Sequence, residues 1–513
     1  MTDSDSCVPK VLTDFVFDLY DSVSTAQLTE EQVQLYSVEF RELSNKYFGN
    51  QPWPSPQSIA AECNGDPLFL AVYRELTHRH LHSVSRPTIR DRVDGWQVYR
   101  EFFEEILEGS DFFLIPSWCF DILNEFVYQF QGYCQIRSAV YASARKQGLL
   151  NADGTVSEGG LPKERGSGGG PSLNLMENLA TLQNSKEAWD AESVFSYLHR
   201  LVKMGLPQEG KTVAPVYSYL SLFASVALSR LECLLGDYTA CLQALTPIVT
   251  YENYVIPKDE DMTIQQVLHS VVGARLSLAY HAGVSFLMLR RYKDAMTTLG
   301  EMCAFLQRGF KTGQLRKLTG SEQFNKQYDR MLSLLAILTH VCPAQGLLED
   351  SVVKAIREKY AARLESASSY EEFFMSPKFV STDPMHGVYR QQVQLFLKEM
   401  EVQPAGRKLR SYLKLYTSLP VDKLAKFYDR STEDFLPLIL SYKARMRQLE
   451  RPAGGSYIDG QVKSALDIHY YMDMNNVHID EAEKTRRFEN YFVAQIMQNS
   501  DIRKEAVTIE TDL

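Results

Sequence analysis

Residues 235–242 (LGDYTACL) and residues 289–296 (LRRYKDAM) share the pattern that decides the fold. In both, an apolar helix ends, the chain turns tightly, a tyrosine follows, and a small residue comes three positions later. Gly236 suits the left-handed position just past a helix end, and Asp237 can cap the helix that follows. Such units build stacked helical hairpins, which present long binding surfaces and rarely hold catalytic groups. The pattern therefore predicts a scaffold.

The sequence around these two units also has helical spacing. From residue 187 to residue 340 apolar side chains recur every three or four positions, which is typical of helices with one buried face. Tyr238 and Tyr292 are 54 residues apart, whereas tetratricopeptide repeats recur about every 34 residues. We therefore expect a degenerate helical repeat. Residues 51–150 have the same spacing and predict a further helical domain.

The C-terminal part changes character. Short helices are expected at residues 407–419, from Pro420, and from Ser431 through Leu449, with Pro437 predicting a kink or a later start in the third. Apolar residues then alternate with polar ones on both sides of a turn at residues 475–476, as in a hairpin of half-buried strands. The alternating apolar residues are Leu466, Ile468, Tyr470, Val477 and Ile479. Three short helices followed by a hairpin predict a winged helix.

Together these patterns predict an all-α dominated chain, in which a helical-repeat solenoid is followed by a small α/β winged helix and a C-terminal helix. The expected segments are 1–50, a helical and partly disordered extension; 51–150, an N-terminal helical domain; 151–185, a glycine-rich linker; 186–400, the helical repeat; 401–480, the winged helix; and 481–513, a helix and tail.

Composition limits the classes of function. The chain has 513 residues and a net charge of −10, which argues against a general nucleic-acid binder. Its eight cysteines include no C-x-x-C pair, so we expect reduced thiols in a cytosolic setting and no structural zinc. The polar N-terminus does not resemble a secretion signal, and no apolar run approaches the roughly 20 residues that span a bilayer. We expect no membrane partner.

Residues 205–212 (GLPQEGKT) match the phosphate-binding P-loop pattern, in which Lys211 and Thr212 would hold phosphate and magnesium. The context is wrong, because residues 194–204 have helical rather than strand spacing and Pro215 interrupts the helix that should follow. His78 and His82 share a helix face, but two ligands make a poor metal site. The sequence offers no credible catalytic set, so we expect no catalytic, cofactor-binding or metal-binding residues, no cofactor and no small-molecule substrate.

A local basic region remains as a candidate for nucleic-acid contact. Residues 407–451 carry eleven Lys or Arg and five Asp or Glu, a net of +6. The third helix of a winged helix can bind nucleic acid, and its candidates here are Lys443, Arg445, Arg447 and Arg451. The alternatives are a solvated helix face or an acidic protein partner.

Several stretches carry a family resemblance. Residues 68–76 (LFLAVYREL), 124–131 (NEFVYQFQ) and 413–425 (LKLYTSLPVDKLA), together with the two repeat units, resemble the subunit L family of eukaryotic translation initiation factor 3 among the PCI-domain proteins. The resemblance covers residues 50–498, and the glycine-rich stretch at 151–170 departs from it. The resemblance implies a non-catalytic, cytoplasmic scaffold subunit, with subunits K and E as expected neighbours, that supports small-ribosomal-subunit recruitment and translation initiation on mRNA.

Partner-binding surfaces follow from this chain's own residues. Strands at 465–471 and 477–480 would form the assembly edge by sheet extension. The last helix would add an apolar side formed by Phe488, Tyr491, Phe492 and Ile496, unless it packs on its own domain. The alternatives are a PCI scaffold of the COP9 signalosome or the proteasome lid, and an RNA-binding winged-helix module with direct rRNA or mRNA contact.

Overall fold

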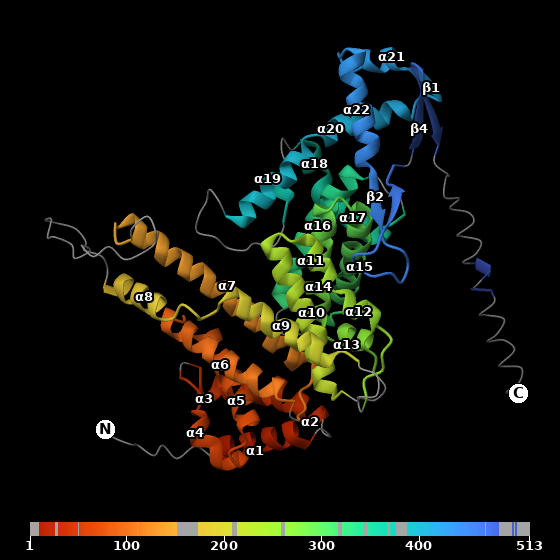
Figure 1. Ribbon diagram of the computed structural model, residues 1–513. Helices are drawn as coiled ribbons and strands as arrows, with labels where there is room; N and C mark the ends of the chain where they lie inside the picture. The colour runs from red at the N-terminus through yellow and green to blue at the C-terminus, as the bar shows by residue number, and fades with distance from the viewer. Residues whose placement is uncertain are drawn as a thin grey trace, which may run out of the picture. The chain divides into compact units, whose positions relative to one another are not determined.

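The computed structural model describes residues 10–25, 29–49, 51–109, 111–150, 173–207, 213–257, 262–315, 321–342, 346–366, 370–375, 387–466, 468–481, 495–496 and 498–499. The chain forms two compact units (Figure 1). The larger unit comprises Met1–His340, Gln345–Met400 and Leu449–Val462, and the smaller unit comprises Val341–Ala344, Glu401–Gln448 and Lys463–Leu513. The boundaries expected at residues 50 and 150 do not separate compact units.

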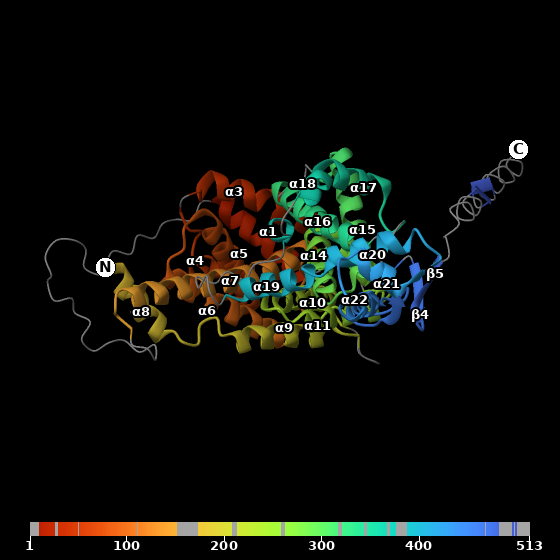
Figure 2. The same cartoon turned by 90° about the horizontal axis from the view of Figure 1, so that it is seen from above.

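The first part of the larger unit is helical. Its elements are α1 (Lys10–Thr25), α2 (Thr29–Gln34), η1 (Leu35–Glu39), α3 (Phe40–Tyr47), α4 (Pro56–Ile59), η2 (Ala60–Cys63), α5 (Pro67–Val84), α6 (Ile89–Leu107) and α7 (Pro116–Lys146). Local sequence sets several starts: Asp66 caps α5, and Thr88 forms a capping box with Asp91 at α6. Helices α6 and α7 lie side by side in Figures 1 and 2.

An aromatic core joins these helices to the segment that follows the glycine-rich stretch. Trp189, between α8 and α9, is 1% exposed, and its indole N–H donates to the Arg92 carbonyl at 2.7 Å. Its ring centroid lies 5.3 Å from that of Trp96, 5.8 Å from that of Tyr99 and 5.4 Å from that of Phe126. Because Trp189 completes this core, residues on both sides of the glycine-rich stretch belong to one unit.

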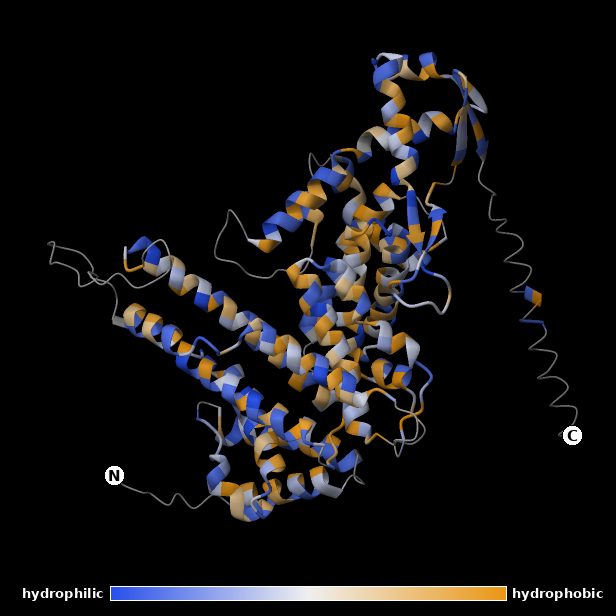
Figure 3. Cartoon of the chain, in the orientation of Figure 1, coloured by the Kyte–Doolittle hydropathy of each residue, from blue (hydrophilic) through white to orange (hydrophobic). Residues whose placement is uncertain are grey.

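The rest of the larger unit is the helical repeat. Its elements are α8 (Leu173–Asn184), α9 (Ala191–Gly205), α10 (Pro215–Leu235), α11 (Tyr238–Gln243), α12 (Thr246–Thr250), α13 (Ile264–Ser270), α14 (Val272–Met288), α15 (Tyr292–Lys311), α16 (Ser321–Val341), α17 (Asp350–Ile356), η4 (Arg357–Ala361), α18 (Ala362–Ser366), η5 (Glu371–Phe373) and α19 (Val388–Met400). Helix α10 contacts α7, α9, α11 and α14, and Figure 3 shows hydrophobic stretches in this group.

Both expected repeat turns are present. Gly236 ends α10 in the left-handed conformation (φ +92°), and the Asp237 carboxylate accepts from the Ala240 amide at 2.8 Å to begin α11. In the second turn Arg290 takes the left-handed position instead (φ +59°), and α15 begins at Tyr292. The helical hairpins predicted from the two motifs are therefore confirmed, with arginine where the first motif has glycine.

One helix in the described part of the chain is long and apolar enough to cross a membrane by length and composition. It is α10, and 83% of its apolar window is buried inside the larger unit, as in the core helix of a soluble protein. Helices α13 and α14 pass the same test only as a pair bent by 100°.

The smaller unit contains α20 (Gln403–Leu413), β1 (Ser418–Pro420), α21 (Val421–Lys426), α22 (Thr432–Arg445), β4 (Ile468–Asp473) and β5 (Asn476–Glu481). The strands form an antiparallel sheet in the order β1-β5-β4. Strands β2 (Arg447–Glu450) and β3 (Gln461–Ser464) form a separate pair. Three helices and an antiparallel hairpin confirm the small α/β region that the sequence predicted.

Several local expectations in this region were wrong. The first helix spans Gln403–Leu413 rather than residues 407–419, because residues 418–420 form β1. Helix α22 ends at Arg445 rather than Leu449, because residues 447–450 pair with β3. It begins at Thr432, so a later start at Pro437 is wrong, while the predicted Ser431 cap is confirmed, because its hydroxyl accepts from the Asp434 amide at 3.1 Å. The hairpin turn lies at residues 474–475, one residue early. Strands β1, β2 and β3 were not expected.

Candidate partner-binding site

The candidate assembly edge is the outer side of β4. Ile479 donates its amide to Thr417 O at 2.9 Å, so the backbone polar groups of alternate β5 residues face β1. The intervening residues His478 and Asp480 face β4, opposite Tyr471 and His469. By the same alternation, the backbone groups of Ile468, Tyr470 and Met472 face away from β5. Within the described residues, no strand pairs with this side of β4.

Lys443 covers part of this edge. Its ammonium donates to the outward carbonyl of Tyr470 at 2.5 Å and lies 5.3 Å from the Tyr470 ring centroid. The Tyr470 hydroxyl in turn donates to Ile439 O at 2.8 Å, which fixes the strand on α22. A lysine across an edge strand hinders unwanted pairing, because its charge must be moved before another strand can add. Lys443, a candidate for RNA contact, thus donates to a backbone carbonyl of its own sheet.

The five alternating residues expected at the edge turn their side chains into the smaller unit. Leu466, Ile468, Tyr470, Val477 and Ile479 are all buried. Their alternation was therefore predicted correctly, but these side chains fill the core and only the backbone of β4 is presented outward. Val477 and Ile479 are not edge residues at all, because β5 lies between β1 and β4.

The structure describes only a small part of the expected C-terminal helix. Phe488, Tyr491 and Phe492 lie outside the described residues. Ile496 belongs to a short described helical stretch and is 66% exposed.

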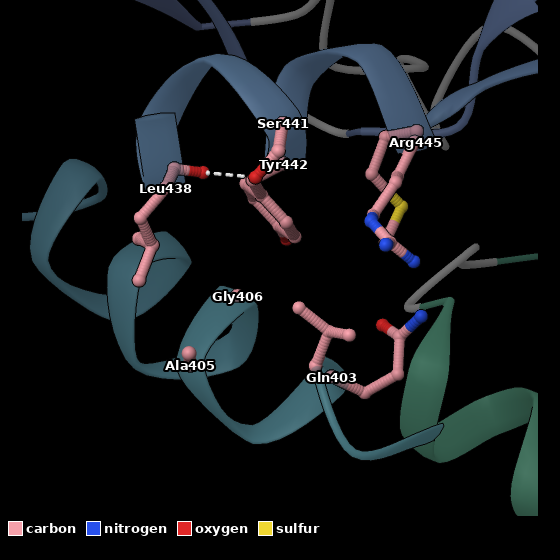
Figure 4. Close-up of a pocket in the computed structure, with 9 residues that line it drawn as sticks. Gln403, Ala405, Gly406, Leu438, Ser441, Tyr442 and Arg445 are labelled. Atoms are coloured by element: carbon pink, nitrogen blue, oxygen red, sulfur yellow. Dashed lines mark hydrogen bonds between the residues drawn. The ribbon is translucent and has the colours of Figure 1, made fainter. Parts of the chain in front are cut away.

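The other basic candidates have different surroundings. Arg445 is half-buried and lines a pocket between α20 and α22 with room for about one water molecule (Figure 4). Figure 4 shows Tyr442 and Arg445 reaching from α22 toward Gly406 and Gln403 of α20. The helices approach closely there, since a Cβ added to Gly406 would lie 2.4 Å from the Tyr442 ring. Arg447 is exposed on β2.

Arg451 belongs to the larger unit, where it holds the segment 449–462. Its amide donates to the Asp294 carboxylate at 3.0 Å, its Nε donates to Gly455 O at 2.7 Å, and its guanidinium lies 4.2 Å from the Tyr457 ring centroid. The Arg451 side chain is therefore engaged by its own chain. Its position does not support the expectation that it binds RNA.

The second repeat motif forms a cradle for the same segment. Buried Arg291 donates to three successive carbonyls, those of residues 457, 458 and 459, at 2.9, 3.2 and 2.7 Å. Its guanidinium also pairs with buried Asp294 at 2.7 Å and lies 4.7 Å from the Phe286 ring centroid. The Phe286 and Tyr457 rings stack with centroids 6.1 Å apart. This Arg291 cradle was missed from sequence, where the motif indicated only a helix turn.

A buried charged network lies among the N-terminal helices. Arg79 donates to the Tyr36 hydroxyl at 2.7 Å, and Tyr36 donates to Asp121 at 2.6 Å. Arg79 Nε is 3.3 Å from Glu75 Oε1, which also accepts from the Tyr99 hydroxyl at 3.2 Å. Burial raises the pKa of the Glu75 carboxyl to about 7. Glu75 and Arg79 contact each other inside the protein, which indicates a structural role, although Glu75 Oε2 and Arg79 Nη2 make no hydrogen bond within the described residues.

The remaining motifs are the P-loop look-alike and the His78–His82 pair. Of the P-loop look-alike, Lys211 and Thr212 lie outside the described residues, and the preceding element is α9 rather than a strand. His78 and His82 lie with ring centroids 4.8 Å apart, and burial lowers their pKa values to about 4 and about 3. No group of three potential metal ligands occurs in the part of the chain that the structure describes.

Comparison with known proteins agrees with the family resemblance. The family model described as RNA polymerase I-associated factor PAF67 matches residues 91–499. The chain is 30% identical to eukaryotic translation initiation factor 3 subunit L of Xenopus tropicalis, over 92% of this chain and 82% of that protein. It is 27% identical to the subunit L of Nematostella vectensis, over 97% and 93%, and 29% identical to that of Mus musculus, over 92% and 82%. The chain belongs to the family of eukaryotic translation initiation factor 3 subunit L.

Proposed function

We propose that this protein is a non-catalytic scaffold subunit of the translation initiation factor 3 complex in the cytoplasm. The observation that carries the proposal is similarity to relatives of that name over nearly the whole length of both chains. The fold supports it, because a helical repeat presents long protein-binding surfaces. In this role the chain binds neighbouring PCI subunits and supports recruitment of the small ribosomal subunit and initiation on mRNA.

The outer edge of β4 is the proposed contact with a neighbouring subunit. A strand from the partner pairs with the outward backbone groups of Ile468, Tyr470 and Met472, and Lys443 moves aside as it adds. Subunits K and E are the proposed neighbours. The segment 481–498 adds an apolar contact through Phe488, Tyr491, Phe492 and Ile496.

Purification of the tagged chain from cytosol tests the complex. We expect other initiation factor 3 subunits to co-purify and the sample to sediment with small ribosomal subunits. If signalosome or proteasome-lid subunits co-purify instead, the fold assignment would stand, but the protein would be a scaffold of that other complex. An ATP titration of the purified chain is expected to show no binding, for the parent and for Lys211→Ala alike.

The edge contact has a sharper test. Met472→Pro removes an outward amide and leaves the hydrogen bonds to β5 in place, since proline is accepted where the N–H faces away from the sheet. We expect the variant to lose co-purification of its neighbour. Tyr471→Ala changes an exposed side chain on the same strand and is expected to assemble normally. Normal assembly of Met472→Pro would contradict the strand-pairing contact without affecting membership in the complex.

A further inference from the structure

Positive charge in the smaller unit gathers on α20 and α21 rather than on α22. Residues 403–430 carry seven Lys or Arg and two Asp, a net of +5 in a chain of net charge −10. Five of these basic residues are exposed, and four of them define the α20–α21 basic face: Lys408, Lys423, Lys426 and Arg430.

The four side chains lie around one short helix. Lys423 and Lys426 are three residues apart on the exposed side of α21, opposite buried Leu424 and Ala425. Lys408 reaches over from α20, where its ammonium donates to Phe427 O at 3.1 Å, next to Lys426. Arg430 follows directly, since its amide donates to Ala425 O at 3.1 Å and closes the end of α21. The four residues therefore lie close together around α21.

Nearby acids do not neutralise this face. The Asp422 carboxylate accepts from Thr432 Oγ1 at 3.1 Å and from Asn475 Nδ2 at 3.0 Å, so it is held by neutral donors. Asp422 and Asp429 are both exposed and each carries one negative charge, which leaves a net of +2 with the four cations. None of the ion pairs between described residues includes a member of the α20–α21 basic face.

The exposed side of α22 has the opposite character. Its outward residues are acidic, neutral or apolar, namely Glu433, Asp434, Pro437, Leu440, Ser441 and Ala444. The helix that reads nucleic acid in many winged helices is therefore unsuited to a polyanion here. Lysine is depleted from protein–protein interfaces, whereas exposed lysine and arginine side chains are suited to phosphates. The chemistry of the α20–α21 basic face favours a nucleic-acid backbone over an acidic protein.

We propose that the α20–α21 basic face is an RNA-binding surface that contacts phosphates with little sequence preference. This contact goes beyond the scaffold role, and it uses a surface other than the outer edge of β4. It replaces Lys443, Arg445, Arg447 and Arg451 as the RNA-contacting set.

The test measures binding of the full-length chain to a fluorescein-labelled single-stranded RNA of mixed sequence by anisotropy over a salt series. One variant combines Lys423→Gln, Lys426→Gln and Arg430→Gln. The matched control combines Lys203→Gln, Lys311→Gln and Lys326→Gln, which removes the same charge from exposed lysines of the larger unit. Thermal unfolding of both variants confirms that they fold.

We expect the α20–α21 variant to bind about 10-fold or more weakly, with the slope of log affinity against log salt reduced by about 2, because three phosphate contacts are lost. The control is expected to bind like the parent. Equal weakening in both variants, or no RNA binding by the parent, would overturn the proposal. Competition by polyglutamate as strong as that by unlabelled RNA would also overturn it and assign the face to an acidic protein.

Discussion

At the scale of single residues, Glu75 gives the protein a dependence on pH. Its pKa is raised from the usual 4.5 to about 7 by burial, so the folded state holds this proton more tightly than the unfolded chain does. Its contribution to stability is therefore complete below pH 4.5 and is lost as pH rises through about 7. We expect Glu75→Gln to flatten the melting temperature against pH between these values. An unchanged pH profile would contradict this assignment.

Arg290 is strained where the first repeat motif has glycine. It is exposed, with φ at +59°, a conformation that costs a side-chain-bearing residue about 1 kcal/mol relative to glycine. We expect Arg290→Gly to raise the free energy of unfolding by about that amount in denaturant titrations. Arg290→Ala keeps a Cβ and serves as the control, with no comparable gain. A loss of stability in Arg290→Gly would show that the arginine side chain contributes more stabilising free energy than the backbone strain costs.

At the scale of elements, the Arg291 cradle fixes the segment 449–462 through backbone carbonyls. Replacing Arg291 by Met leaves the buried Asp294 carboxylate without its ion-pair partner, with the Arg451 amide still donating to it, and should cost about 3–5 kcal/mol of stability. Hydrogen exchange should show faster exchange at residues 451–459 in this variant.

Arg291→Lys tests whether the positive charge alone is enough or whether the hydrogen-bonding geometry of the guanidinium is needed. A lysine ammonium keeps the pairing with Asp294 but cannot reach three successive carbonyls as the guanidinium fork does. We expect intermediate stability and faster exchange over residues 457–459. Exchange as slow as in the parent would contradict the role of the fork. Arg290→Lys, at the exposed neighbour, is the control.

Elements were predictable where their signals are local. The periodicity of α10 and the capping residues around Gly236 are contained within a few turns, so the helical hairpins could be read from sequence. Strands β1 and β2 have three and four residues and depend on pairing with β5 and β3, which local sequence does not encode. The alternation of apolar residues correctly identified which side chains of β4 and β5 are buried. It could not identify the edge strand, because that depends on β1, which the sequence did not predict.

At the scale of the whole molecule, Trp189 joins two parts of the larger unit. Its removal in Trp189→Ala leaves a cavity among Trp96, Tyr99 and Phe126 and should cost about 3–5 kcal/mol. Because this core and the repeat belong to one unit, we expect hydrogen exchange to accelerate in α5–α7 and in α9–α10 together. Trp189→Phe fills part of the cavity and should cost less. Acceleration confined to one part would contradict the single unit.

The same tryptophan sets an order of events during synthesis. The chain leaves the ribosome from its N-terminus, so α5, α6 and α7 emerge while the residue that completes their aromatic core is still being added. Those helices cannot close their core until Trp189 has left the exit tunnel. The nascent chain thus exposes an unfinished apolar surface during translation, until Trp189 has emerged and can cover it.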